Sequence, residues 1–68
     1  MQEEAVGIVA GNVWKHLSDN GASDVIKIKF ALNITNTELF LSLGWLLREG
    51  KLKLWEENSL IKAAIKEA

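Results

Sequence analysis

The sequence contains no cysteine, no proline and only one histidine, His16. Without cysteine the chain can form no disulfide bond, no thiolate metal site and no thiol nucleophile. Without proline nothing kinks a helix in its interior or marks a rigid linker. A cysteine-free small domain fits the reducing cytoplasm, which is the location that we predict.

Long apolar runs and a secretory signal are also missing. Charged side chains such as Lys27 and Arg48 interrupt the longest apolar stretches, so that no segment is long enough to span a bilayer. Residues 1–4 include two glutamates, where a secretory signal would be basic. We therefore expect no membrane segment, and the sequence implies no cofactor and no small-molecule ligand.

The 68 residues are enough for one domain, which we expect to span residues 1–68 without repeats or a linker. The formal net charge is −1, so the overall charge does not mark a nucleic-acid-binding protein. The distribution is uneven, because residues 24–53 carry five basic side chains against three acidic ones. Phosphate contacts would be expected in this middle third. A domain of this size has little core, and dimerisation would stabilise it.

The first predicted helix covers residues 3–18. Apolar residues recur along it at helical spacing and would form one buried stripe. Gly7 and Gly11 lie on one face, although each costs roughly 1 kcal/mol relative to alanine inside a helix. A close helix crossing in the core would explain both glycines. The predicted stripe consists of Val6, Ala10, Val13 and Leu17, widened by Ile8, Val9 and Trp14.

Residues 24–32 fit two different structures. The strict alternation of residues 26–30 and their β-branched side chains favour a strand. The same segment also has a helical stripe, and either Ser23 or Asp24 could cap a helix there. The local pattern favours the strand and leaves the helix open. The helical stripe consists of Val25, Ile28 and Leu32.

Residues 36–49 carry the clearest helix signal. Thr35 and Glu38 have the spacing of a capping box, in which each side chain accepts a hydrogen bond from the other residue's backbone N–H. Arg48 in the last turn and Gly50 just beyond it are typical of a helix end. The expected buried face consists of Leu39, Leu43, Leu46 and Leu47.

Residues 51–65 are predicted to form a hairpin. Residues 51–54 alternate like a half-buried strand, and the turn can be formed by residues 57–58 or 58–59. The alternative is a helix capped at Ser59, which the alanine content of residues 60–65 favours. In the hairpin, one face would consist of Leu52, Leu54, Ile61, Ala63 and Ile65, and the other face would carry Lys51, Lys53 and Lys62 near Trp55.

Two stretches match a known family pattern. The first is residues 6–14 (VGIVAGNVW), followed by Leu17, and the second is residues 39–51, which contain LGWL at 43–46 and REGK at 48–51. With the order of the elements, they resemble a family of small stand-alone prokaryotic winged helix-turn-helix proteins, generally described as uncharacterised.

The resemblance implies an α+β fold with three helices and a C-terminal two-stranded wing. It implies that residues 24–32 are the first helix of the helix-turn-helix, with residues 33–35 as the turn. It also implies that residues 60–65 are the last strand of the wing, and that a short third strand lies near Ala22 and Ser23.

DNA binding, in a transcription-related role, is the leading functional expectation, and it is based on the fold. The second helix of a helix-turn-helix enters the major groove, and its first residues touch base edges. Asn36 and Thr37 occupy these positions, although Asn36 can equally stand there because asparagine favours a first turn. Phosphate contacts would come from Lys27, Lys29, Lys51, Lys53 and Lys62, each of which can also be an ordinary solvated lysine.

Protein association is the alternative function. Residues 36–49 contain no lysine and one arginine, so this helix offers few cations to DNA phosphates. Several large apolar residues fall outside the predicted buried stripes, and exposed apolar patches usually mark an interface. In a different helix register they would complete a monomer core instead. The candidates for a homodimer or partner interface are Ile26, Phe30, Phe40, Leu41 and Trp55.

Catalysis finds little support, and we expect neither an enzyme nor a metal site. Ser18 and Asp19 follow His16 closely, but one helical turn cannot arrange the three as nucleophile, base and orienting group. Glu56 and Glu57 are adjacent, so on a strand they point to opposite faces.

Overall fold

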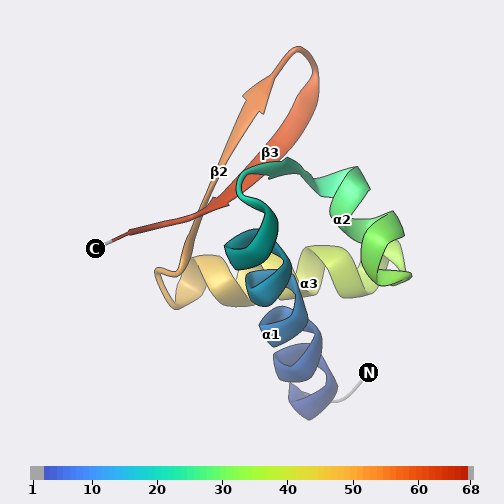
Figure 1. The fold of residues 1–68 in the computed structure, drawn as a ribbon. Helices are drawn as coiled ribbons and strands as arrows, with labels where there is room; N and C mark the ends of the chain where they lie inside the picture. The colour runs from blue at the N-terminus through green and yellow to red at the C-terminus, as the bar shows by residue number, and fades with distance from the viewer. Residues whose placement is uncertain (1–2, 68) are drawn as a thin grey trace.

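The computed structural model describes residues 3–67, which form three helices and one three-stranded antiparallel sheet (Figure 1). The α+β expectation is confirmed. The hairpin projects away from the helices, and α1 crosses α3 below it (Figure 1). The elements in chain order are α1 (Glu3–Asn20), β1 (Ser23–Asp24), α2 (Val25–Leu32), α3 (Asn36–Arg48), β2 (Leu52–Glu57) and β3 (Leu60–Ile65).

Helix α1 begins where predicted and ends two residues later, at Asn20. Gly21 stops it, because its φ of 79° lies in the left-handed region and its N–H donates to the Leu17 carbonyl at 2.8 Å. The predicted stripe is buried at Ala10, Val13 and Leu17. Ile8 does not widen this stripe as expected, since 67% of its surface is exposed.

The segment that the alternating pattern assigned to a strand is helix α2, as the resemblance implied. Asp24 caps its first turn, because Oδ1 accepts from the N–H groups of Ile26 at 2.8 Å and Lys27 at 3.3 Å. Asn33 ends it in the left-handed region, with a φ of 53°. These two local signals, with the burial of Ile28, outweigh the β-propensity of the segment.

Helix α3 starts with the predicted capping box. The Glu38 N–H donates to Thr35 Oγ1 at 3.0 Å, and the Thr35 N–H donates to Glu38 Oε1 at 2.9 Å. At the other end Gly50 has a φ of 70°, and the Lys51 N–H donates to the Leu46 carbonyl at 2.9 Å. This pair of features closes a Schellman motif.

One residue of the expected buried face of α3 was assigned wrongly. Leu47 is 44% exposed, whereas Ser42 is fully buried. Ser42 tolerates burial because its hydroxyl donates to the Glu38 carbonyl one turn earlier. The core side of α3 is therefore centred on Leu39, Leu43 and Leu46, and Leu47 lies beyond its edge.

Residues 52–65 form the hairpin, so the alternative of a helix from Ser59 is wrong. Asn58 and Ser59 both have positive φ, 54° and 65°, which is the signature of a two-residue type I′ turn. The short strand β1 pairs with β3, so β3 lies in the middle of the sheet. This pairing confirms the third strand that the resemblance implied near Ser23.

The core lies where the three helices meet the inner face of the hairpin. Leu52 and Ala63 contribute to it from the sheet, and Leu54 and Ile65 pack against it. No helix in residues 3–67 combines the length and the apolar character needed to cross a membrane. The buried apolar residues are Ala10, Val13, Leu17, Val25, Ile28, Leu39, Leu43, Leu46, Leu52 and Ala63.

Replacing Thr35 by alanine should lower the free energy of unfolding by about 1 kcal/mol, because the Glu38 N–H loses its acceptor. Urea denaturation followed by circular dichroism measures this loss. Thr37→Ala is the matched control, since Thr37 lies exposed in the same turn and its loss should change stability by less than about 0.5 kcal/mol. Equal losses in the two variants would contradict the capping role.

Candidate interaction surface

The outward face of α3 is mostly apolar. Phe40 is 52% exposed and Leu41 is 46% exposed, and Leu47 is also partly open to solvent. The helix has one basic side chain, Arg48, in its last turn. Its exposed surface therefore offers apolar contact over most of its length and positive charge only at the end.

The first turn of α3 presents the predicted base-contacting pair. Asn36 and Thr37 are both exposed there. The side chain of Glu38, the acidic residue next to them, forms a hydrogen bond in the capping box. This turn is sterically open to a partner, and its only charged side chain is acidic.

Helix α2 presents a second apolar row on its outward side. Ile26 is 43% exposed and Phe30 is 72% exposed, so neither completes a monomer core. Lys29 Nζ lies 4.7 Å from the centroid of the Phe30 ring, a cation–π distance. We call Ile26 and Phe30 on α2, with Phe40 and Leu41 on α3, the apolar rows.

The outer face of the hairpin brings together two of the predicted lysines and Trp55. Lys53 Nζ lies 5.9 Å from the centroid of the Trp55 ring, and Lys62 is the cross-strand partner of Trp55. Trp55 is half-buried, and its indole N–H donates to Glu57 Oε1 at 3.2 Å. Trp55 thus lies in a patch of two lysines and one glutamate on the wing, on a different element from the apolar rows.

Lys51 lies apart from this patch. Its Nζ is 3.8 Å from Glu49 Oε1, in an exposed ion pair. The structure therefore distributes the predicted phosphate contacts over three places: Lys27 and Lys29 on α2, Lys53 and Lys62 on the wing, and Lys51 beside a carboxylate.

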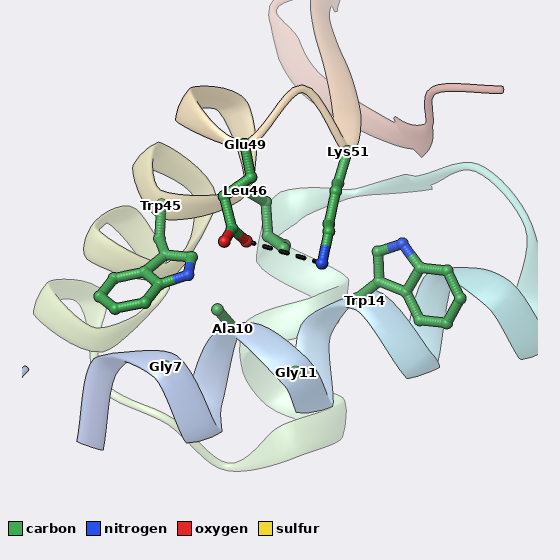
Figure 2. Close-up of a pocket in the computed structure, with 8 residues that line it drawn as sticks. All are labelled: Gly7, Ala10, Gly11, Trp14, Trp45, Leu46, Glu49 and Lys51. Carbon is green, nitrogen blue, oxygen red and sulfur yellow. Dashed lines mark ion pairs between the residues drawn. The ribbon is translucent and has the colours of Figure 1, made fainter. Parts of the chain in front are cut away.

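Sequence reasoning missed a groove between α1 and α3, which has a volume of about 320 Å³ (Figure 2). Trp14 and Trp45 stand on either side of it in Figure 2, and the α1 backbone forms its floor between them. The spacing of Gly7 and Gly11 was the signal that could have revealed it. The lining residues are Gly7, Ala10, Gly11, Trp14, Trp45, Leu46, Glu49 and Lys51.

The expectation that a tight helix crossing requires both glycines is wrong. A Cβ on Gly11 would meet no atom within 4 Å, and one on Gly7 would lie 3.5 Å from Trp45 Cζ2, an ordinary van der Waals contact. Packing within the described chain therefore requires neither glycine.

A family model described as a winged helix-turn-helix domain (DUF2582) matches residues 1–64. This chain belongs to that family. It is also similar to the solution NMR structure of protein BT2368 from Bacteroides thetaiotaomicron, with a TM-score of 0.84 and 29% sequence identity over 96% of this chain and 79% of that chain. Among curated proteins, none matches the chain significantly.

In this winged helix-turn-helix fold, α2 and α3 form the helix-turn-helix and β2–β3 form the wing. The acidic and basic side chains balance in both elements: α3 carries Glu38 and Arg48, and the wing strands carry two lysines and two glutamates. Domains of this family type are typically binding modules rather than enzymes. Within residues 3–67 no three histidine, cysteine, aspartate or glutamate side chains gather as a metal site would need.

Proposed function

We propose that this winged helix-turn-helix domain is a protein-interaction module that docks through the apolar rows of α2 and α3. The observation that carries the proposal is Phe30, an aromatic ring 72% exposed on a helix whose other face is in the core. Exposed aromatic side chains are typical anchors of protein interfaces. The other three members of the rows are each between 43% and 52% exposed, so both α2 and α3 offer apolar side chains to a partner.

The charges beside the rows indicate the chemistry of the partner. Lys27 is exposed on α2, and the Lys29 ammonium lies against the Phe30 ring. A partner with an apolar centre and an acidic rim would cover the rings and pair with both ammonium groups. We therefore propose a partner segment that combines large apolar side chains with aspartate or glutamate.

A random peptide library displayed on phage tests this function. Selected peptides should contain aromatic or branched apolar residues next to acidic ones. A synthetic copy of such a peptide should bind Phe30→Ser at least ten-fold more weakly than the wild type, because the anchor ring is lost. Leu60→Ser is the matched control, since it removes an exposed apolar side chain from the wing and should leave binding unchanged. Peptides that bind Phe30→Ser as tightly as the wild type would contradict the proposal.

DNA binding, in a transcription-related role, is the second candidate. The specific observation in its favour is the pair of wing lysines, Lys53 and Lys62, that flank Trp55, together with the open first turn of α3 at Asn36 and Thr37. The wing lysines would then make the main contacts with the DNA phosphates, and the first turn of α3 would make additional contacts. Either function fits the reducing cytoplasm, because the chain has no cysteine.

Titration into random duplex DNA at several salt concentrations tests the second candidate. If Lys27, Lys53 and Lys62 each neutralise one phosphate, log K should fall with log [salt] with a slope of about −2.7. Lys53→Glu should weaken binding, whereas Lys66→Glu, which lies just beyond the end of β3, should not. If no binding is measurable even at low salt, DNA binding is excluded.

A further inference from the structure

The outward face of α1 carries a self-complementary row of four residues. Glu4, Ile8, Gly11 and Lys15 are all exposed, and they follow one another at intervals of four, three and four residues. This spacing is that of the seam between two paired helices. Ile8 is 67% exposed, and the space over Gly11 is open. Within the described chain, nothing explains an apolar side chain and a glycine in this position.

We propose that α1 pairs in antiparallel orientation with α1 of a second copy of this chain. The two-fold axis passes midway between Val9 and Ala10. Each residue of α1 therefore faces the partner residue for which the two residue numbers add up to 19. Glu4 then faces the partner's Lys15, and Ile8 faces the partner's Gly11. The symmetry repeats both contacts, so the dimer has two opposite-charge pairs at its ends and two apolar contacts at its centre.

The groove beside this row supplies the space that the pairing needs. An isoleucine side chain that approaches Gly11 from outside comes to lie beside the groove between Trp14 and Trp45 (Figure 2). Glycine lets the helix axes come close, and a side chain at this position would hold them apart. The helix penalty of Gly11, which packing within the chain does not explain, is offset by this contact.

The size of the surface predicts a weak dimer. The chain exposes 4662 Å² in total. A contact that covers about a tenth of this area on each copy buries roughly 900 Å² in all, which is at the lower end for specific interfaces. We therefore expect dissociation in the micromolar range or weaker. Because the apolar rows lie on α2 and α3, the dimer would present two of these surfaces at once.

Sedimentation equilibrium of the whole chain measures the dimer and its charge pairs. Glu4→Lys and Lys15→Glu should each raise the dissociation constant about ten-fold, because each places like charges at both ends. The double variant Glu4→Lys/Lys15→Glu should return it to within about two-fold of the wild type. Lys15 also lies 3.9 Å from Asp19 within its own helix, so circular dichroism must show equal helix content in all variants. A strict monomer at about 1 mM, or a double variant no better than the single ones, would overturn the proposal.

Disulfide cross-linking tests the register of the paired helices. Because the sequence contains no cysteine, only the introduced cysteines can form a disulfide. A mixture of Ile8→Cys and Gly11→Cys should form the mixed disulfide faster than either variant forms its own, since only positions 8 and 11 face each other. Phe30→Cys is the control for a dimer formed through the apolar rows. Faster cross-linking of Phe30→Cys than of the 8/11 mixture would overturn the α1 pairing and leave the proposed docking function intact. Loss of peptide binding in Phe30→Ser would be unaffected by either result.

Discussion

Leu39→Ala should leave a large part of the protein unfolded at 25 °C. Leu39 is completely buried at the end of the first turn of α3, so its replacement removes apolar contact and leaves a cavity, at a cost of about 2–5 kcal/mol. A single core of this size supplies only about 3–5 kcal/mol of net stability. Urea denaturation followed by tryptophan fluorescence and circular dichroism measures the loss.

Leu41→Ala is the matched control for this variant. Leu41 lies two residues further along the same helix and is 46% exposed, so its truncation should change stability by less than about 0.5 kcal/mol. The pair separates loss of burial from loss of a leucine in a helix. Similar unfolding curves for both variants would contradict the assignment of Leu39 to the buried face of α3 and of Leu41 to its exposed face.

Ala63→Leu should destabilise the domain by about 1–3 kcal/mol, through overpacking rather than through a cavity. Ala63 is fully buried in β3, the central strand, where it faces Leu54 on one side and Ser23 on the other. Three extra carbon atoms have no space there without displacing the helices. The same urea denaturation measures the change.

The neighbouring alanine is the control. Ala64 points to the opposite face of β3 and lines a second groove, of about 420 Å³, together with Trp14 and Ala22. A leucine at position 64 has room and should change stability by less than about 0.5 kcal/mol. If the Ala64 variant were the unstable one, the register of the hairpin would be shifted by one residue, because such a shift exchanges the two faces.

The helix boundaries show which parts of the fold can be predicted from sequence. The capping box of Thr35 and Glu38 and the stop at Gly50 are formed by neighbours in the chain, so they were predicted with their partners. The segment that became α2 has only 8 residues, too few for periodicity to separate a helix from a strand. The caps at Asp24 and Asn33 favour the helix over the strand. Their hydrogen bonds form only when the turns that flank the helix are in place.

The candidate surface was also predictable in part, because the helical pattern shows which apolar residues lie away from the buried stripes. Phe30 and Phe40 lie off the helical stripes, and the structure leaves both exposed, as their positions indicated. The sequence hinted at the groove but could not specify its shape, because that shape depends on how α1 crosses α3. Gly7 and Gly11 were the only sequence signal of it, and they were attributed to the interior of the protein.

The order β1–β3–β2 leaves β2 with one backbone edge unpaired within the described chain. Such an edge can recruit a strand from another molecule and start aggregation. Along β2, Lys53, Glu56 and Glu57 place charges of both signs beside this edge. An incoming strand would have to match this pattern of charges as well as the hydrogen bonds. The protein should therefore stay dispersed at the high concentrations at which weak, specific contacts of its helices become measurable.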